Sequence, residues 1–75
     1  MPKNKKAQDA LLRILREHGG LLHLVAVEYE LYGCHVLNAD ERRYPEAIIG
    51  EAQRDGKVLY DPKTGCLSLV EVAQE

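Results

Sequence analysis

The spacing of apolar positions predicts that the first element of the chain is a helix. Between residues 7 and 18, inward-facing candidates recur at the intervals of one helix face (Ala7, Leu11, Ile14, Leu15 and His18). Asn4 is placed to cap the start of this helix, and Gly19-Gly20 is placed to end it. We therefore expect a first helix with a single buried stripe.

Residues 21–32 are apolar almost throughout, with His23, Glu28 and Glu30 as the polar exceptions. A stretch of this composition is expected to be buried on most sides. Residues 21–25 fit either a short strand that leads into a helix or the first turn of one continuous helix, and periodicity leaves both open. Gly33 is expected to end the segment.

The next helix signal is a capping box, in which Asn38 is followed three residues later by Glu41. The helix then meets Pro45, which is tolerated in a first turn and disruptive further in. Either a short turn over residues 40–43 precedes a helix that begins near Pro45, or one longer helix is kinked there. The apolar positions that follow would face inward (Ile48, Ile49 and Ala52).

The last third of the chain has the pattern of a β-hairpin. Residues 57–60 and 66–70 have the pattern of strands. In the loop between them, Pro62 presets φ for the turn and Gly65 takes the left-handed position before the second strand. Such a hairpin is marginal alone and must pack on the helices. The sequence thus predicts an α+β domain over residues 7–70, with a flexible basic tail (1–6) and a fraying C-terminus (71–75).

Composition narrows the function classes. A chain of 75 residues has room for one core but not for a deep catalytic pocket beside it. It carries no Ser-His-Asp, P-loop or dinucleotide motif, so we expect neither an enzyme nor a cofactor. Adjacent Cys34 and His35 cannot easily ligate one ion together, so no metal site is expected. With no Phe or Trp present, at least three of the four tyrosines are expected in the core (Tyr29, Tyr32, Tyr44 and Tyr60).

Two cysteines are too few for a disulfide scaffold, and neither a secretory signal nor a membrane-length apolar run is found. These features predict a cytoplasmic protein with reduced thiols and no membrane partner. The formal net charge is -2, but it is unevenly distributed. Residues 1–6 carry three lysines and no acid, whereas the rest of the chain carries seven basic and twelve acidic side chains.

The order of the predicted elements resembles the winged helix-turn-helix family over about residues 7–70. The stretch that carries this resemblance best is the third helix with its closing glycine and following strand (residues 48–60), then the loop 61–65 and the strand 66–69. The resemblance implies three helices and a C-terminal two-stranded wing. It also implies that the third helix enters the major groove of DNA while the hairpin loop lies near the phosphates.

Carried onto this sequence, the resemblance implies a small DNA-binding regulator with double-stranded DNA as partner. An Arg can bind guanine and a Gln can bind adenine in bidentate fashion, and lysines can meet phosphates. Because few positive charges give weak affinity, a homodimer that binds two half-sites is expected. The implied contacts are on the helix (Arg42, Arg43, Glu46, Gly50 and Gln53), the wing (Lys57, Lys63 and Thr64) and the tail (Lys3, Lys5 and Lys6).

Charge favours a second hypothesis. Residues 38–57 carry four basic and five acidic side chains, which is unusual for an element that enters a DNA groove. The alternative is a winged-helix module that binds another protein, as an adaptor, an assembly subunit or an inhibitor, and does not bind DNA. This hypothesis predicts an exposed apolar patch on residues 25–32 or along the hairpin edge.

Overall fold

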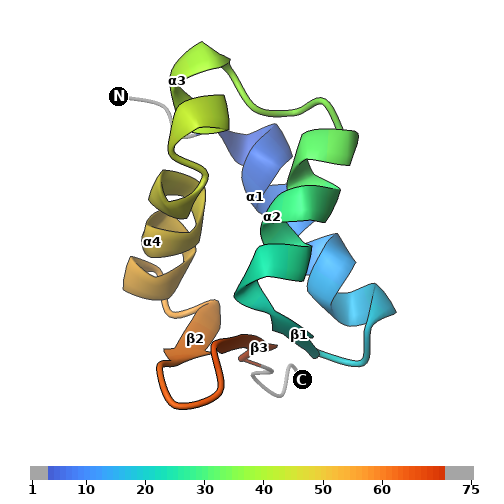
Figure 1. Cartoon of the computed structure of the whole chain (residues 1–75), viewed down its shortest axis with the longest axis vertical. Helices are drawn as coiled ribbons and strands as arrows, with labels where there is room; N and C mark the ends of the chain where they lie inside the picture. The colour runs from blue at the N-terminus through green and yellow to red at the C-terminus, as the bar shows by residue number, and fades with distance from the viewer. Residues whose placement is uncertain (1–3, 71–75) are drawn as a thin grey trace.

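The computed structural model describes residues 4–70, which form a small α+β domain (Figure 1). Within these residues the three strands make one antiparallel sheet in the order β1-β3-β2, and four helices pack on it and on one another. Lys3 and the end predicted to fray, residues 71–75, lie outside the described residues. The elements in chain order are α1 (Lys5–Glu17), β1 (Leu21–His23), α2 (Leu24–Gly33), α3 (Ala39–Arg43), α4 (Glu46–Arg54), β2 (Val58–Asp61) and β3 (Cys66–Leu69).

Helix α1 follows its sequence pattern closely. The Asn4 side chain accepts a hydrogen bond from the Ala7 N–H at 3.1 Å, so the predicted cap is confirmed. The helix begins at Lys5, which places both Lys5 and Lys6 in the helix rather than in a tail ahead of it. The predicted stripe is confirmed at four of its five positions (Ala7, Leu11, Ile14 and Leu15).

His18 is the exception to that stripe. The helix ends at Glu17, so the helical periodicity that would carry His18 over the core has already stopped. Its side chain is exposed, and Nε2 lies 2.8 Å from Oε2 of Glu30 on α2. The expected burial of His18 is therefore wrong, and the residue instead joins the ends of two helices at the surface.

The open question at residues 21–25 is resolved in favour of a strand that leads into a helix. Leu21–His23 pairs with β3, and α2 begins at Leu24 with the His23 ring nitrogen Nδ1 accepting a hydrogen bond from the Val25 N–H. The sheet therefore has three strands instead of the two expected for a lone hairpin. Local periodicity could not show this, because strand β1 is three residues long and depends on pairing with β3, more than forty residues away along the chain.

The capping box is confirmed, since Asn38 and Glu41 exchange hydrogen bonds of 2.9 Å at the start of α3. Helix α3 has only five residues, and Pro45 stands at the start of α4. Of the two alternatives, the short turn followed by a new helix is the one observed. The described part of the chain consequently has four helices where three were expected.

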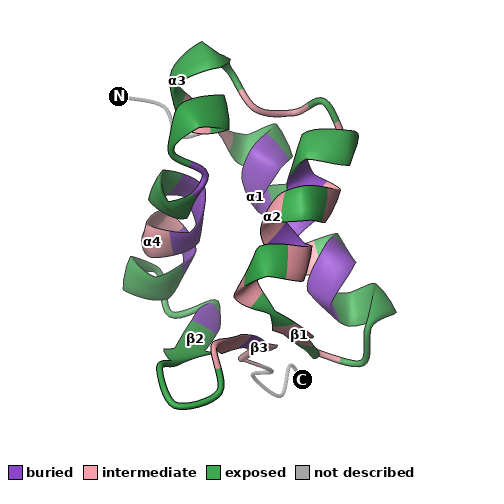
Figure 2. Cartoon of the chain, in the orientation of Figure 1, coloured by how far each residue is buried: buried purple, intermediate pink, exposed green. Residues whose placement is uncertain are grey.

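The core lies between α1, α2, α4 and the inner face of the sheet (Figure 2). Its one buried polar side chain among the described residues is Gln8, whose Nε2 donates to the carbonyl oxygen of Ile48 at 2.9 Å and to Glu51 Oε1 at 3.1 Å. Gln8 thereby fixes α1 against α4. The sequence pattern gave no signal for it, because a glutamine beside a buried stripe usually faces solvent.

Gly65, in the hairpin loop, lies close to His23 of β1. Gly65 has φ +74°, and a Cβ built there would stand 2.7 Å from Nε2 of His23. The positive φ therefore favours glycine, and a side chain at this position would also force the His23 ring to shift. No helix among residues 4–70 combines the length and the hydrophobicity needed to cross a lipid bilayer.

Candidate interaction surface

Helix α2 exposes a row of large apolar side chains. Val25, Tyr29 and Tyr32 follow one another at helical spacing, and their exposed fractions are 65%, 77% and 38%. On the opposite side of the helix, Val27 and Leu31 are fully buried. The expectation that this segment is buried on most sides is therefore wrong: one face of α2 is enough to fill the core, and the other remains in solvent.

The expectation that at least three of the four tyrosines lie in the core is also wrong. All four are exposed, so the core contains no aromatic ring among its buried residues. It is filled by aliphatic side chains of α1, α2, α4 and the strands, which leaves no room for rings. Tyr32 has a structural contact all the same, because its hydroxyl donates to the carbonyl oxygen of Arg42 at 2.9 Å and so joins α2 to α3.

Next to this row lies a hollow of about 250 Å³ between the start of α2, α4 and β2. Figure 1 shows where α2, α4 and β2 lie in the fold. The wall of this hollow is mostly apolar and includes Ile49. Gly50 also lines the hollow, and a Cβ built at Gly50 would meet only the Arg54 side chain, at 3.6 Å. The full lining is Leu24, Glu46, Ile49, Gly50, Gln53 and Tyr60.

Glu46 lines the hollow, and its carboxylate interacts with that of Glu28 on α2. Burial raises the pKa of Glu28 on α2 above its ordinary value, and the nearby Glu46 carboxylate on α4 raises it further. The two carboxylates, one on α2 and one on α4, repel each other when both are ionised, and together they create a region of negative potential. A cation placed between them would relieve this repulsion.

The structure separates the residues implied as DNA contacts. Glu46, Gly50 and Gln53 line the hollow just described. Lys5 and Lys57 line a different hollow, of about 320 Å³, together with Gln8, Asp9 and Asp55. These lysines therefore do not extend the surface formed by the outer residues of α4.

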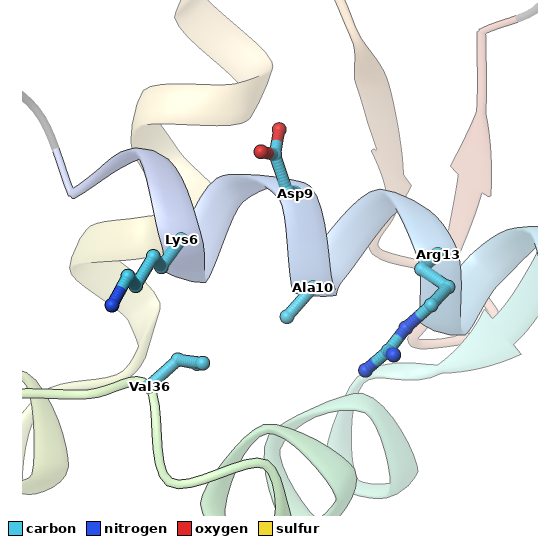
Figure 3. Close-up of a pocket in the computed structure, with 5 residues that line it drawn as sticks. All are labelled: Lys6, Asp9, Ala10, Arg13 and Val36. Carbon is cyan, nitrogen blue, oxygen red and sulfur yellow. The ribbon is translucent and has the colours of Figure 1, made fainter.

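Lys6 lies on a third part of the surface. It lines a hollow of about 300 Å³ between α1 and the connection from α2 to α3. In Figure 3, Lys6 and Arg13 project from α1 on the side of Val36, whereas Asp9 points away from it. The Arg13 guanidinium also donates to the Cys34 sulfur at 3.4 Å.

The remaining implied contacts are exposed. Arg42 and Arg43 project from α3, and Lys63 and Thr64 lie in the hairpin loop. The loop is held by a bond from its backbone to a side chain, because Asp61 Oδ1 accepts a hydrogen bond from the Lys63 N–H at 2.9 Å. Thr64 also acts locally, since its hydroxyl accepts from the Cys66 N–H at 3.3 Å.

Within residues 4–70, no cluster of three or more side chains could hold a metal ion, and both cysteine thiols are free. Compared with protein-family models, with curated proteins and with solved structures, the chain has no significant match. Its function is therefore inferred from its own geometry. That geometry brings together an exposed apolar row, an apolar hollow and two acidic side chains on α2, α4 and β2.

Proposed function

We propose that this domain is a protein-interaction module that binds a partner polypeptide on the face formed by α2, α4 and β2. The observation that carries the proposal is the row Val25, Tyr29 and Tyr32, which is exposed although the helix also has a complete buried face. Contiguous exposed apolar side chains are typical of interaction sites in small domains. Tyrosine is also among the residues enriched at the centre of protein interfaces.

The row and the hollow lie on adjacent sides of α2. Leu24 lines the hollow, and Val25, the next residue of the same helix, begins the row. Because consecutive helical residues lie about 100° apart, the two features occupy neighbouring sides of α2. A partner can therefore insert an apolar side chain into the hollow while it covers the tyrosines.

Glu46 in the lining of the hollow, with Glu28 nearby on α2, indicates the charge of that partner. A Lys or Arg placed between Glu28 and Glu46 would offset their repulsion. The partner that fits is thus a segment in which a basic residue adjoins large apolar residues. Phosphate groups would meet the same two carboxylates unfavourably.

We further propose that the fold is of the winged-helix type. The order of helices and strands and the sheet order β1-β3-β2 support this proposal. In such a fold α4 would stand where the third helix of the family stands. The outer side of that helix here carries Glu46, Gly50 and Gln53 around an apolar hollow, which suits a polypeptide better than a DNA groove.

A displayed library of random peptides, selected on the purified domain, tests the proposal. We expect enriched peptides that combine Lys or Arg with large apolar residues, and NMR shifts at Leu24, Ile49 and Gly50 when a synthetic copy is titrated. Glu46→Lys should weaken binding by ~10-fold or more, since it turns attraction of a cation into repulsion. Glu17→Lys is the matched control, because it makes the same charge change at the far end of α1. Shifts confined to other surfaces, or equal effects of the two variants, would contradict the proposal.

DNA binding is the second candidate, and one observation favours it: Arg42, Arg43, Gln53 and Lys63 are all exposed. Titration with a mixed-sequence DNA duplex at two salt concentrations tests it, because phosphate contacts weaken as salt rises. Salt-dependent NMR shifts at these four residues would support DNA binding. Unchanged spectra at low salt would exclude it.

A further inference from the structure

Three positions of α1 face the connection from α2 to α3. Lys6, Ala10 and Arg13 recur at intervals of four and three residues, so their side chains leave the helix on the same side. Lys6 and Arg13 are exposed and stand about 10 Å apart along the helix axis. Because Ala10 between them is short, a hollow of about 300 Å³ remains between the two long side chains and Val36 (Figure 3).

Hydrogen bonds hold the walls of this hollow in place. The Val36 carbonyl oxygen accepts from the Asn4 side chain at 2.9 Å, which ties the connection to the start of α1. The Arg13 guanidinium donates to the Cys34 sulfur at 3.4 Å, which keeps this cation beside the same connection. The hollow is therefore preformed, and Ala10 and Val36 give it an apolar floor.

The two cations of the hollow have no acidic partner among residues 4–70. Asp9 also lines the hollow, but its carboxylate points away from Val36 and pairs with Lys5 at 3.5 Å (Figure 3). Lys6 pairs with no described carboxylate, and the sulfur atom that Arg13 contacts is a weak acceptor. The hollow thus presents two positive charges on either side of an apolar floor.

We propose that this hollow is a second interaction surface, which binds an acidic segment of a partner polypeptide. Two carboxylates of the segment pair with Lys6 and Arg13, and an apolar side chain between them covers Ala10 and Val36. An extended chain rises by about 3.3 Å per residue, so acidic residues about three positions apart match the separation of the cations. The apolar floor favours a polypeptide over a nucleic acid, whose phosphates would leave Ala10 and Val36 uncovered.

This surface shares no lining residue with the hollow between α2, α4 and β2 on which the proposed function rests. The two hollows also differ in charge, since Glu46 lines the first whereas Lys6 and Arg13 line the second. A basic segment that suits the first is repelled by the second. The domain would therefore bind two different segments, and either proposal can fail without the other.

Peptide selection with a subtraction step tests the proposal. A displayed library of random peptides is selected on the full chain and then depleted on the variant Lys6→Glu/Arg13→Glu. We expect the remaining peptides to carry two acidic residues about three positions apart, with apolar residues between them. A synthetic copy should shift the NMR signals of Ala10 and Val36 and leave that of Ile49 unchanged. Lys6→Glu and Arg13→Glu should each weaken binding by ~10-fold or more, because each replaces attraction with repulsion.

Lys63→Glu is the matched control, since it makes the same charge change in the exposed hairpin loop and should leave the affinity unchanged. Circular dichroism should show that all variants are folded, because the substituted side chains are exposed. Inorganic phosphate and a mixed-sequence DNA duplex are the competing ligands. Shifts of Ala10 and Val36 that either produces as strongly as the peptide would overturn the proposal in favour of a phosphate site. No peptide left after depletion, remaining peptides without acidic pairs, or equal effects of Lys63→Glu and Lys6→Glu would overturn it as well.

Discussion

Helices α1 and α2 lie against each other, yet they use their apolar residues differently. Helix α1 keeps its large apolar side chains in or against the core, and its other face is charged. Helix α2 buries Val27 and Leu31 and exposes Val25, Tyr29 and Tyr32. The difference shows that one face of each helix is enough to fill the core of this small domain, so the apolar residues on the outer face of α2 remain exposed.

The largest effect should come from the buried face of α2. Leu31→Ala removes a fully buried side chain and should lower the free energy of unfolding by about 2–5 kcal/mol. Tyr29→Ala, on the exposed face of the same helix, should change it by no more than about 0.5 kcal/mol. Urea denaturation followed by circular dichroism measures both. Similar losses for the two variants would mean that the outer face also contributes to folding.

The second effect concerns the contact between α1 and α4. Gln8→Ala removes the hydrogen bond to the Ile48 carbonyl oxygen, and should cost about 1–2 kcal/mol because that buried group loses a partner. Gln53→Ala, at an exposed position on α4, is the matched control. A Gln8→Ala variant as stable as the control would show that α1 and α4 are held by apolar packing alone.

A smaller and opposite effect is expected at Gly50. Alanine fits there, since its Cβ meets only Arg54 at ordinary contact distance, and the gain in helix propensity should stabilise the domain by up to about 1 kcal/mol. The same methyl group narrows the hollow, so peptide binding should weaken while thermal stability rises. Unchanged affinity would show that a bound peptide does not approach this part of α4.

The smallest effect is a pH dependence at Glu28. Its pKa is raised in the folded protein, so the folded state holds the proton more tightly and loses stability as pH rises above the unfolded value of 4.5. Glu28→Gln lacks this loss, so its stability relative to wild type should be higher at pH 7 than at pH 4. Thermal denaturation of both proteins at the two pH values checks the sign. A Glu28→Gln variant that is more stable than wild type only at pH 4 would contradict this expectation.

Much of the fold could be predicted from the sequence, and the candidate site could be predicted less well. The cap at Asn4, the stripe of α1, the capping box at Asn38 and the hairpin are local features, and all were predicted. Strand β1 was one of two alternatives that the sequence left open, and the buried Gln8 was not predicted, because each depends on a partner distant in the chain. The residues implied as DNA contacts were chosen by resemblance, and the structure distributes them over α1, α3, α4 and the hairpin.

The sequence by itself determined which segments form helices and where most of them end, because caps, glycines and apolar spacing act within a few residues. It could not determine which apolar residues remain in solvent. Residues 21–32 contain more apolar side chains than one core-facing surface can hold, and composition does not say which are in excess. Only the tertiary structure decided this, since the packing of α1, α4 and the sheet limits the volume that α2 can fill.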